Sequence, residues 1–253
     1  MFETMTLPRQ GILDFPIGVV MKSLTDGYLE HDHDYVEINV IVRGTARHIV
    51  DGKPQRIRAG EAFVLNPGTR HGFADTDNLV FYQAMFDPVL LNPCLPVLKK
   101  MSGYHALFIL EPAAAAASSP FRSRLSLDTK ALQTIAMLFE EMIREINEKR
   151  EGWQALVQAG LIRLVTALCR QHCGAGRDDP GAIHRIARTA AHIEKNYLQP
   201  LPLESLAAVA GCSVSQLIRD FKRSYGATPA GYVLHLRLEH AIQLLKDKSL
   251  TVT

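Results

Sequence analysis

Residues 203–226, LESLAAVAGCSVSQLIRDFKRSYG, decide how the C-terminal part of the chain folds. Apolar residues recur at helical spacing on both sides of Gly211, a residue that can end a helix in the left-handed backbone conformation. Ser213 follows at once and is a favourable N-cap for a second helix. The stretch therefore predicts two short helices joined by a tight turn, which is a helix-turn-helix arrangement.

The second of these helices has an apolar face and a polar face. Val214, Leu217, Phe221 and Tyr225 share the apolar face, and Asp220 is the only acid on the helix. A polar, basic helix after a tight turn can lie in the major groove of DNA. The same pattern also fits the solvated face of an ordinary helical hairpin, so this stretch by itself leaves both interpretations open.

If the second helix enters the major groove, we expect some of its side chains to contact bases and others to contact phosphate. We expect Ser215, Gln216 and Arg219 to contact base edges and Ile218 to lie near a thymine methyl group. Lys222 and Arg223 are better suited to phosphate. The candidate DNA-binding residues, with the N-cap included, are Ser213, Ser215, Gln216, Ile218, Arg219, Lys222 and Arg223.

The residues that follow extend the pattern. Gly226 ends the second helix, Thr228 can cap the next and Pro229 fits its first position. The run FKRSYGATPAGYVLHLRLEHAIQLL, residues 221–245, resembles the DNA-binding domain of the AraC/XylS family of bacterial transcription factors. This resemblance implies promoter DNA as a partner. It also implies a second helix-turn-helix after the long helix, whereas this sequence stops at Thr253, so we expect an incomplete DNA-binding domain.

Composition and charge are those of a globular protein with a basic C-terminal part. The chain has 253 residues, 47% of them hydrophobic and 21% charged, which allows two domains. From residue 181 onward nine Lys and Arg residues face five acids, against nineteen and twenty-one before it. We expect no signal peptide, no membrane span and four reduced cysteines, hence a cytoplasmic protein.

The N-terminal third has the pattern of antiparallel β-structure. Asp51-Gly52 is a strong hairpin signal, and Gly44 is expected to break the strand before it. Several short strands separated by turn residues predict a sandwich or barrel. The expected strands are residues 35–43, 45–50, 55–58, 61–66 and 79–86.

Four polar residues in this region are of types that bind metal ions. His31, His33 and Glu37 share one face if their strand is unbroken, and His71 arrives from another strand. Together with Gly44, Gly60 and residues 67–68, they resemble the two motifs of the cupin superfamily, whose fold is a small β-barrel. The resemblance implies that His31, His33, Glu37 and His71 could hold a divalent transition metal.

Two other interpretations of these four residues remain open. In sugar-responsive regulators of this architecture, such residues can contact the hydroxyl groups of an effector instead. They could also form a structural histidine network at the barrel mouth. Residues 71–86 and 103–112 resemble rhamnose-operon regulators loosely, which implies a monosaccharide effector.

The middle of the chain predicts a connector. Apolar periodicity indicates one helix from Asp128 to about residue 150 and a second from Trp153 to Cys173. This hairpin either packs only on its own barrel or pairs two copies of the chain as a homodimer. Residues 107–110 are expected to form a strand, residues 113–120 an exposed segment, residues 174–181 a linker and residues 183–197 a helix.

The prediction is an α+β protein with an antiparallel β cupin barrel, a helical hairpin and an all-α helix-turn-helix domain. We place the effector domain at residues 1–112, the hairpin at 113–176 and the DNA-binding domain at 177–253. The expected function is that of an effector-responsive transcription factor and not an enzyme. The alternatives are a metal-dependent cupin enzyme with a helical appendage, and a truncated regulator that sequesters full-length partners through the hairpin.

Overall fold

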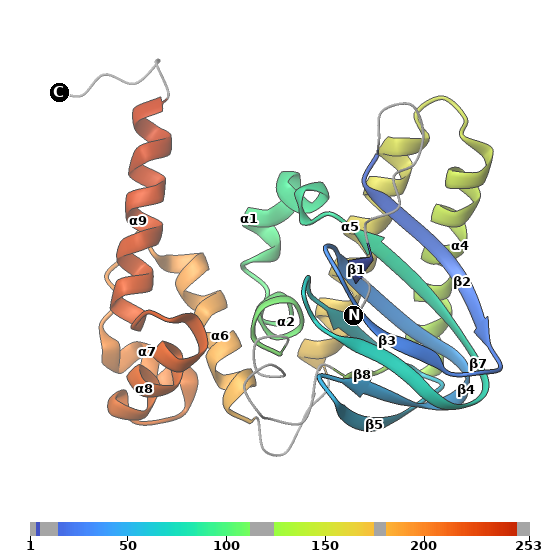
Figure 1. The fold of residues 1–253 in the computed structure, drawn as a ribbon. Helices are drawn as coiled ribbons and strands as arrows, with labels where there is room; N and C mark the ends of the chain where they lie inside the picture. Colours follow the sequence, from blue (N-terminus) through green and yellow to red (C-terminus); the bar gives the residue numbers. More distant parts are fainter. Residues whose placement is uncertain (1–3, 6–14, 112–123, 175–180, 247–253) are drawn as a thin grey trace.

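A sheet-rich N-terminal part and a helical C-terminal part lie side by side, with short helices between them (Figure 1). The computed structural model describes residues 4–5, 15–111, 124–174 and 181–246. The segment expected to be exposed, residues 113–120, and most of the expected linker, residues 175–180, lie outside the described residues. Within the described residues, no helix is both long enough and apolar enough to cross a membrane.

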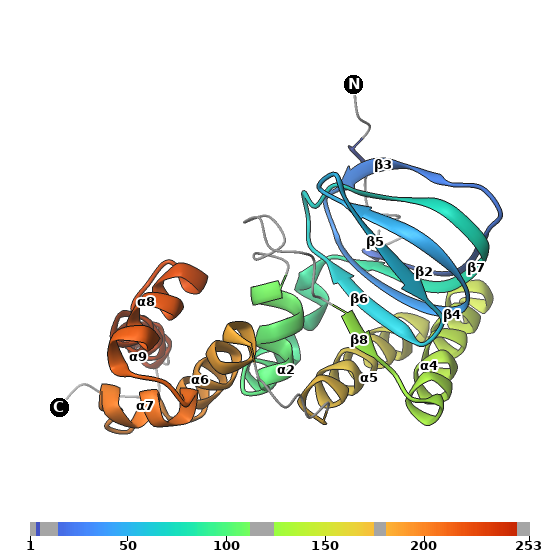
Figure 2. The same cartoon turned by 90° about the horizontal axis from the view of Figure 1, so that it is seen from below.

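The strands curl into one eight-stranded barrel-like sheet (Figure 2). All pairs are antiparallel except β1 with β3. Strands β2 and β3 both pair with β7, while β5 and β6 both pair with β4. The strands are β1 (Thr4–Met5), β2 (Ile17–Leu24), β3 (Tyr28–His33), β4 (Val36–Val50), β5 (Lys53–Arg58), β6 (Glu61–Leu65), β7 (His71–Phe86) and β8 (Arg124–Ser126).

Gly44 bends β4 but does not end it, so the expected break is wrong. The strand runs through this position with shifts in its register against β7. Gly44 has φ of +80°, and a Cβ there would overlap the backbone oxygens of Asp77 and Asn78. The irregularity acts as a β-bulge, because it switches the residues that face the barrel interior from odd to even numbers. Strand β7 is likewise longer than the expected 79–86.

The first half of β4 is buried on both faces. Ile38 and Val40 belong to the core under the helices, whereas Ile41 belongs to the core inside the barrel. Glu37 and Asn39 alternate with the outward residues and are fully buried. In this half of the strand, Glu37 and Asn39 therefore point into the barrel together with Ile41, whereas Ile38 and Val40 point outward.

The hairpin predicted at Asp51-Gly52 is confirmed. Val50 pairs with Lys53, which leaves a two-residue loop. Asp51 and Gly52 have φ of +47° and +72°, the backbone signs of a type I′ turn.

A short helical segment follows the barrel. It consists of η1 (Pro88–Cys94), α1 (Leu95–Leu98), α2 (Ser102–Tyr104) and η2 (His105–Leu110). The strand expected at residues 107–110 is wrong, because these residues form the π-helical η2. A four-residue apolar run fits a strand or a buried helix equally well, and only its packing separates the two.

The predicted helical pair is confirmed. Helix α4 (Thr129–Glu148) begins where the Asp128 side chain accepts a hydrogen bond from the Ala131 N–H at 2.7 Å. Helix α5 (Trp153–Gly174) packs antiparallel to α4, and Phe139 and Leu161 are fully buried against the outer face of the sheet. This packing on the barrel accounts for one apolar face of the hairpin.

The C-terminal helices are α6 (Ala182–Asn196), α7 (Leu203–Ala210), α8 (Val214–Tyr225) and α9 (Pro229–Lys246). Gly211 and Gly226 end α7 and α8 in the left-handed conformation, as the sequence predicted. Leu206, Leu217 and Phe221 are fully buried in a core separate from the two cores of the sheet, and Ala106 and Leu110 of η2 also enter it. The two helices therefore form the predicted helix-turn-helix.

Candidate ligand cluster and DNA-binding surface

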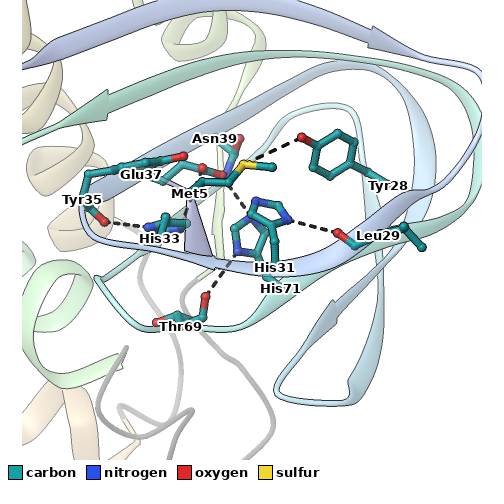
Figure 3. Close-up of polar contacts among 10 residues, drawn as sticks. All are labelled: Met5, Tyr28, Leu29, His31, His33, Tyr35, Glu37, Asn39, Thr69 and His71. Atoms are coloured by element: carbon teal, nitrogen blue, oxygen red, sulfur yellow. Dashed lines mark hydrogen bonds and ion pairs between the residues drawn. The ribbon is translucent and has the colours of Figure 1, made fainter. Parts of the chain in front are cut away.

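Three side chains from three strands meet inside the barrel: His33 of β3, Glu37 of β4 and His71 of β7 (Figure 3). One candidate ligand atom from each lies within 4.8 Å of the others. The Glu37 carboxylate is 3.4 Å from His71 Nε2 and 3.8 Å from His33 Nε2. All three residues are buried.

The strand expected to carry His31, His33 and Glu37 together is interrupted. His31 and His33 lie at the end of β3, and Glu37 is the second residue of β4, after a bend at residues 34–35. His31 still joins the cluster, because β3 pairs with β7 and places His31 opposite His71, with their rings 4.4 Å apart. The structure thus brings all four predicted residues together, although His31 is not part of the tightest three-residue group.

Backbone carbonyls fix the orientation of the histidine rings. His33 Nδ1 donates to the Tyr35 carbonyl at 2.8 Å and His31 Nδ1 to the Leu29 carbonyl at 3.0 Å. His71 Nδ1 has a longer bond of 3.4 Å to the Thr69 carbonyl. In a neutral ring whose Nδ1 carries the hydrogen, Nε2 is the atom that can bind a cation, and the Nε2 atoms of His33 and His71 face Glu37.

Opposing effects act on the charge of Glu37. Burial raises the pKa of its carboxyl group, but His71, His33 and a hydrogen bond from Asn39 outweigh burial and hold the pKa below its usual range. Asn39 Nδ2 donates to the Glu37 carboxylate at 2.6 Å. Burial lowers the pKa of His31 and of His33. Burial thus favours the neutral forms of His31 and His33, the form in which an imidazole binds a cation.

Sequence analysis missed two polar residues that belong to the same interior. Asn39 lies opposite Gln83 in the pairing of β4 with β7, and both are buried. The sequence contained a signal for Asn39, because polar Glu37 and Asn39 alternate with apolar residues in residues 36–40. Lys22 also lines the space beside the cluster, and burial lowers the pKa of its amine.

The cavity beside the cluster is small. Its volume is about 20 Å³, and Tyr28, His31, Glu37, His71 and Gln83 are among its lining residues. A single water needs at least about 10–15 Å³ by this measure, and pockets for drug-sized ligands are typically about 300–1,000 Å³. A cavity of this size can hold an ion or a water molecule.

The donor set fits a divalent transition metal. His33 Nε2 and the Glu37 Oε2 atom are buried, and no group in the described part of the chain forms a hydrogen bond with either. Two imidazoles and a carboxylate are ligands that Zn²⁺ and similar ions accept. His33, Glu37 and His71 would hold the ion, with His31 beside them, and the ion would supply Lewis acidity there.

The polar face of α8 is open to solvent, as predicted. Ser215, Arg219, Lys222 and Arg223 are exposed, whereas Gln216 and Ile218 are half-buried. The Ser213 side chain caps the helix by accepting from the Gln216 N–H at 3.2 Å.

Asp220, the only acid on α8, does not belong to this exposed face. Its side chain is buried and lies 3.2 Å from the Arg223 guanidinium and 3.6 Å from that of Arg219. Asp220 thus forms ion pairs with two of the candidate DNA-binding arginines.

A barrel with a closed polar interior, joined to a helix-turn-helix whose second helix exposes basic residues, defines a ligand-sensing DNA-binding regulator. Comparison with known families agrees with this class. The AraC-like ligand binding domain matches residues 23–165, more than half of the chain, and a helix-turn-helix domain matches residues 206–253. The chain belongs to the AraC-like family, which confirms the resemblance seen in the sequence.

Several transcriptional activators are similar along most of their length. The HTH-type transcriptional activator RhaS of Enterobacter sp. (strain 638) is 25% identical over 94% of this chain and 81% of that protein. The HTH-type transcriptional activator RhaR of Escherichia coli O139:H28 is 24% identical over 94% and 80%. A solved structure of the AraC-like transcriptional activator CuxR aligns with a TM-score of 0.39 at 16% identity, over 89% of this chain and 76% of that one.

Proposed function

We propose that this protein is a transcription factor in which a ligand held by His31, His33, Glu37 and His71 controls the binding of α8 to promoter DNA. The observation that carries the proposal is the buried cluster, which leaves unpartnered polar atoms inside a barrel attached to an exposed basic helix. Unpartnered buried polar atoms are costly, and a bound ligand would satisfy them. No catalytic role is proposed for the cluster.

A monosaccharide is the first candidate ligand. Besides the cluster, the interior offers Asn39 Oδ1 and Gln83 Oε1, buried acceptors that form no hydrogen bond with any described group. Sugar hydroxyl groups could donate to both. A sugar would need the barrel to open, because the cavity of about 20 Å³ is far smaller than a typical pocket.

A divalent transition metal is the second candidate, and the geometry of His33, Glu37 and His71 favours it specifically. It fits the closed cavity without any opening. This candidate also keeps open the alternative of a metal-dependent cupin enzyme, which we place second because the chain also has a helix-turn-helix.

A thermal-shift experiment on the full chain separates these candidates. The protein is first treated with a chelator and then titrated with Zn²⁺, Ni²⁺ or a panel of pentoses, hexoses and deoxyhexoses. A ligand at a hundred times its dissociation constant adds about 2.7 kcal/mol to the free energy of unfolding. For a chain of this size the midpoint would rise by roughly 5–10 °C.

Each outcome assigns the site differently. A sugar-specific rise in chelated protein identifies a metal-free sugar sensor. A rise with metal that Glu37→Gln abolishes, without any response to sugars, identifies a metal site and requires assays for enzymatic activity. No response to any sugar or metal would contradict a ligand role for the cluster.

We further propose that the protein acts in the cytoplasm as a homodimer paired through α4 and α5. Met137 on α4 and Leu156 on α5 are largely exposed, at 60% and 57%, on the helices of the hairpin. Sedimentation velocity would show a dimer that Met137→Glu dissociates. A monomer at high concentration would contradict the pairing, and a dimer that fails to bind DNA would favour the sequestering regulator.

A further inference from the structure

One short segment touches the barrel, the hairpin and the DNA-binding helices at once. It comprises α2 and η2, residues 102–110, and lies between the sheet and α6 (Figure 1). Gly103 lies so close to α5 that a Cβ would overlap the backbone of Cys169. Ala106 and Leu110 are buried in the C-terminal core with Ile186 of α6. A segment of the N-terminal part thus completes the core of the DNA-binding part.

His105 at the start of η2 bonds directly to the proposed recognition helix. It is fully buried, its Nε2 lies 2.6 Å from the Lys99 carbonyl, and its Nδ1 lies 2.7 Å from the Tyr225 hydroxyl. A carbonyl only accepts, so Nε2 carries the hydrogen and Nδ1 accepts from the Tyr225 hydroxyl. Burial lowers the pKa of His105 to about 4, so the ring is neutral near pH 7 and keeps this arrangement.

The other end of the segment is bonded to the turn that carries part of the cluster. Asn66, which follows β6, donates through Nδ2 to the Phe108 carbonyl of η2 at 3.1 Å. Two residues later the Gly68 N–H donates to the carbonyl of His33 at 2.8 Å. The Thr69 carbonyl accepts from His71 Nδ1 at 3.4 Å. The 66–69 turn therefore contacts two cluster residues on one side and η2 on the other.

We propose that η2 relays the state of the barrel to α8, with Asn66 as its input and the His105–Tyr225 hydrogen bond as its output. His105 and Tyr225 are then positioning residues for the recognition helix. The purpose of this relay rests on the proposed function, whereas the contacts that form it do not. A π-helix, an element that often occurs at functional sites, forms its middle.

Hydrogen–deuterium exchange on the full chain, without effector or DNA, tests the output contact. Tyr225→Phe removes one hydroxyl group and keeps the ring. We expect faster amide exchange in both residues 102–110 and residues 214–225, by about fivefold for the loss of one buried hydrogen bond. Tyr232→Phe is the matched control, because its hydroxyl donates to Glu194 within the C-terminal helices at 2.6 Å. The control should leave residues 102–110 unchanged.

The input contact is tested with Asn66→Ala, whose control is Asn196→Ala. Asn196 also donates to a backbone carbonyl, that of His192 at 2.8 Å, but within one helix. Asn66→Ala should accelerate exchange in α8, although the bond it removes belongs to the barrel and η2. In a relay, the double variant Asn66→Ala/Tyr225→Phe should accelerate α8 less than the product of the two single effects.

Three results would overturn the relay. Tyr225→Phe could accelerate α8 alone, Asn66→Ala could leave α8 unchanged, or the two effects could multiply independently. The contact would then be structural packing. If Tyr225→Phe does not fold, Asn66→Ala and its control decide the question alone. Because no ligand enters the experiment, failure here is distinct from failure of the proposed function, which the thermal-shift titration measures.

Discussion

The barrel interior and the surface of α8 hold their polar side chains in opposite ways. In the barrel, Glu37 and His33 are buried, come from different strands and are oriented by hydrogen bonds within the protein. On α8, Arg219 and Lys222 are exposed and come from one helix. We infer that the barrel site depends on the whole fold, whereas the α8 surface depends on one helix. Substitutions should therefore affect stability in the first region and mainly recognition in the second.

The largest effect is expected at the buried contact between the two parts, as a dependence of stability on pH. Burial lowers the pKa of His105 from an ordinary value of 6.5 to about 4. As the pH falls from about 7 to about 4, the unfolded chain binds a proton that the folded chain does not. The free energy of unfolding should therefore fall over this window, by at most about 3 kcal/mol from this group.

Denaturant unfolding of wild type and His105→Gln at several pH values measures this effect. Burial also lowers the pKa values of His31 and His33. Both residues are present in both proteins and contribute equally to the two pH profiles. The difference between the profiles therefore reports His105. Parallel pH profiles for the two proteins would show that His105 does not titrate in this window.

The next effect concerns the barrel. Glu37→Gln removes the carboxylate that His33 and His71 face, so the stabilisation by whichever ligand responds in the thermal-shift titration should disappear, a loss of about 2.7 kcal/mol at saturating ligand. Glu61→Gln is the matched control, since Glu61 is a buried acid of the same barrel outside the cluster. Equal stabilisation of both variants by the ligand would contradict the assignment of Glu37 to the ligand site.

On α8 the expected effect is on recognition alone. Arg219→Ala should reduce discrimination between the preferred and altered operator sequences by about 1–3 kcal/mol. Because the Arg219 side chain is 69% exposed, the free energy of unfolding should change by less than about 0.5 kcal/mol. Binding titrations on both sequences and denaturant unfolding measure the two quantities. Equal loss of affinity on every sequence would contradict a base contact.

Lys222→Ala gives the contrasting result expected for a phosphate contact. Affinity should fall evenly across sequences, and the slope of log K against log salt should become shallower by about one. Titrations at several salt concentrations measure the slope. An unchanged slope would place Lys222 away from the DNA backbone.

The smallest effect should come from the cap of α8. Ser213→Ala removes the side-chain acceptor of the Gln216 N–H and should cost about 1 kcal/mol of stability. Ser213→Asn, which keeps an acceptor, should restore most of it. Denaturant unfolding that shows no loss in the alanine variant would mean that solvent satisfies this N–H equally well.

Local signals in the sequence were sufficient for the elements that depend on neighbouring residues. Gly211, Ser213 and Gly226 set the ends of α7 and α8, and Asp51-Gly52 set a hairpin, because backbone conformation and capping act over a few residues. The residues 107–110 were misread, since an apolar run does not reveal which core it enters. The membership of the four-residue cluster was also predicted, from a motif rather than from geometry.

By itself the sequence determined the helix-turn-helix, the antiparallel strands, the helical hairpin and the residue types of the cluster. Tertiary structure alone decided that the register shifts between Ile41 and Arg47 switch the inward face of β4, that Asn39 and Gln83 share the interior with Glu37, and that the cavity is small. It alone placed His105 against Tyr225, residues 120 positions apart. The physical reason is range: caps and turns are fixed by bonds between near neighbours, whereas these contacts exist only when distant segments pack together.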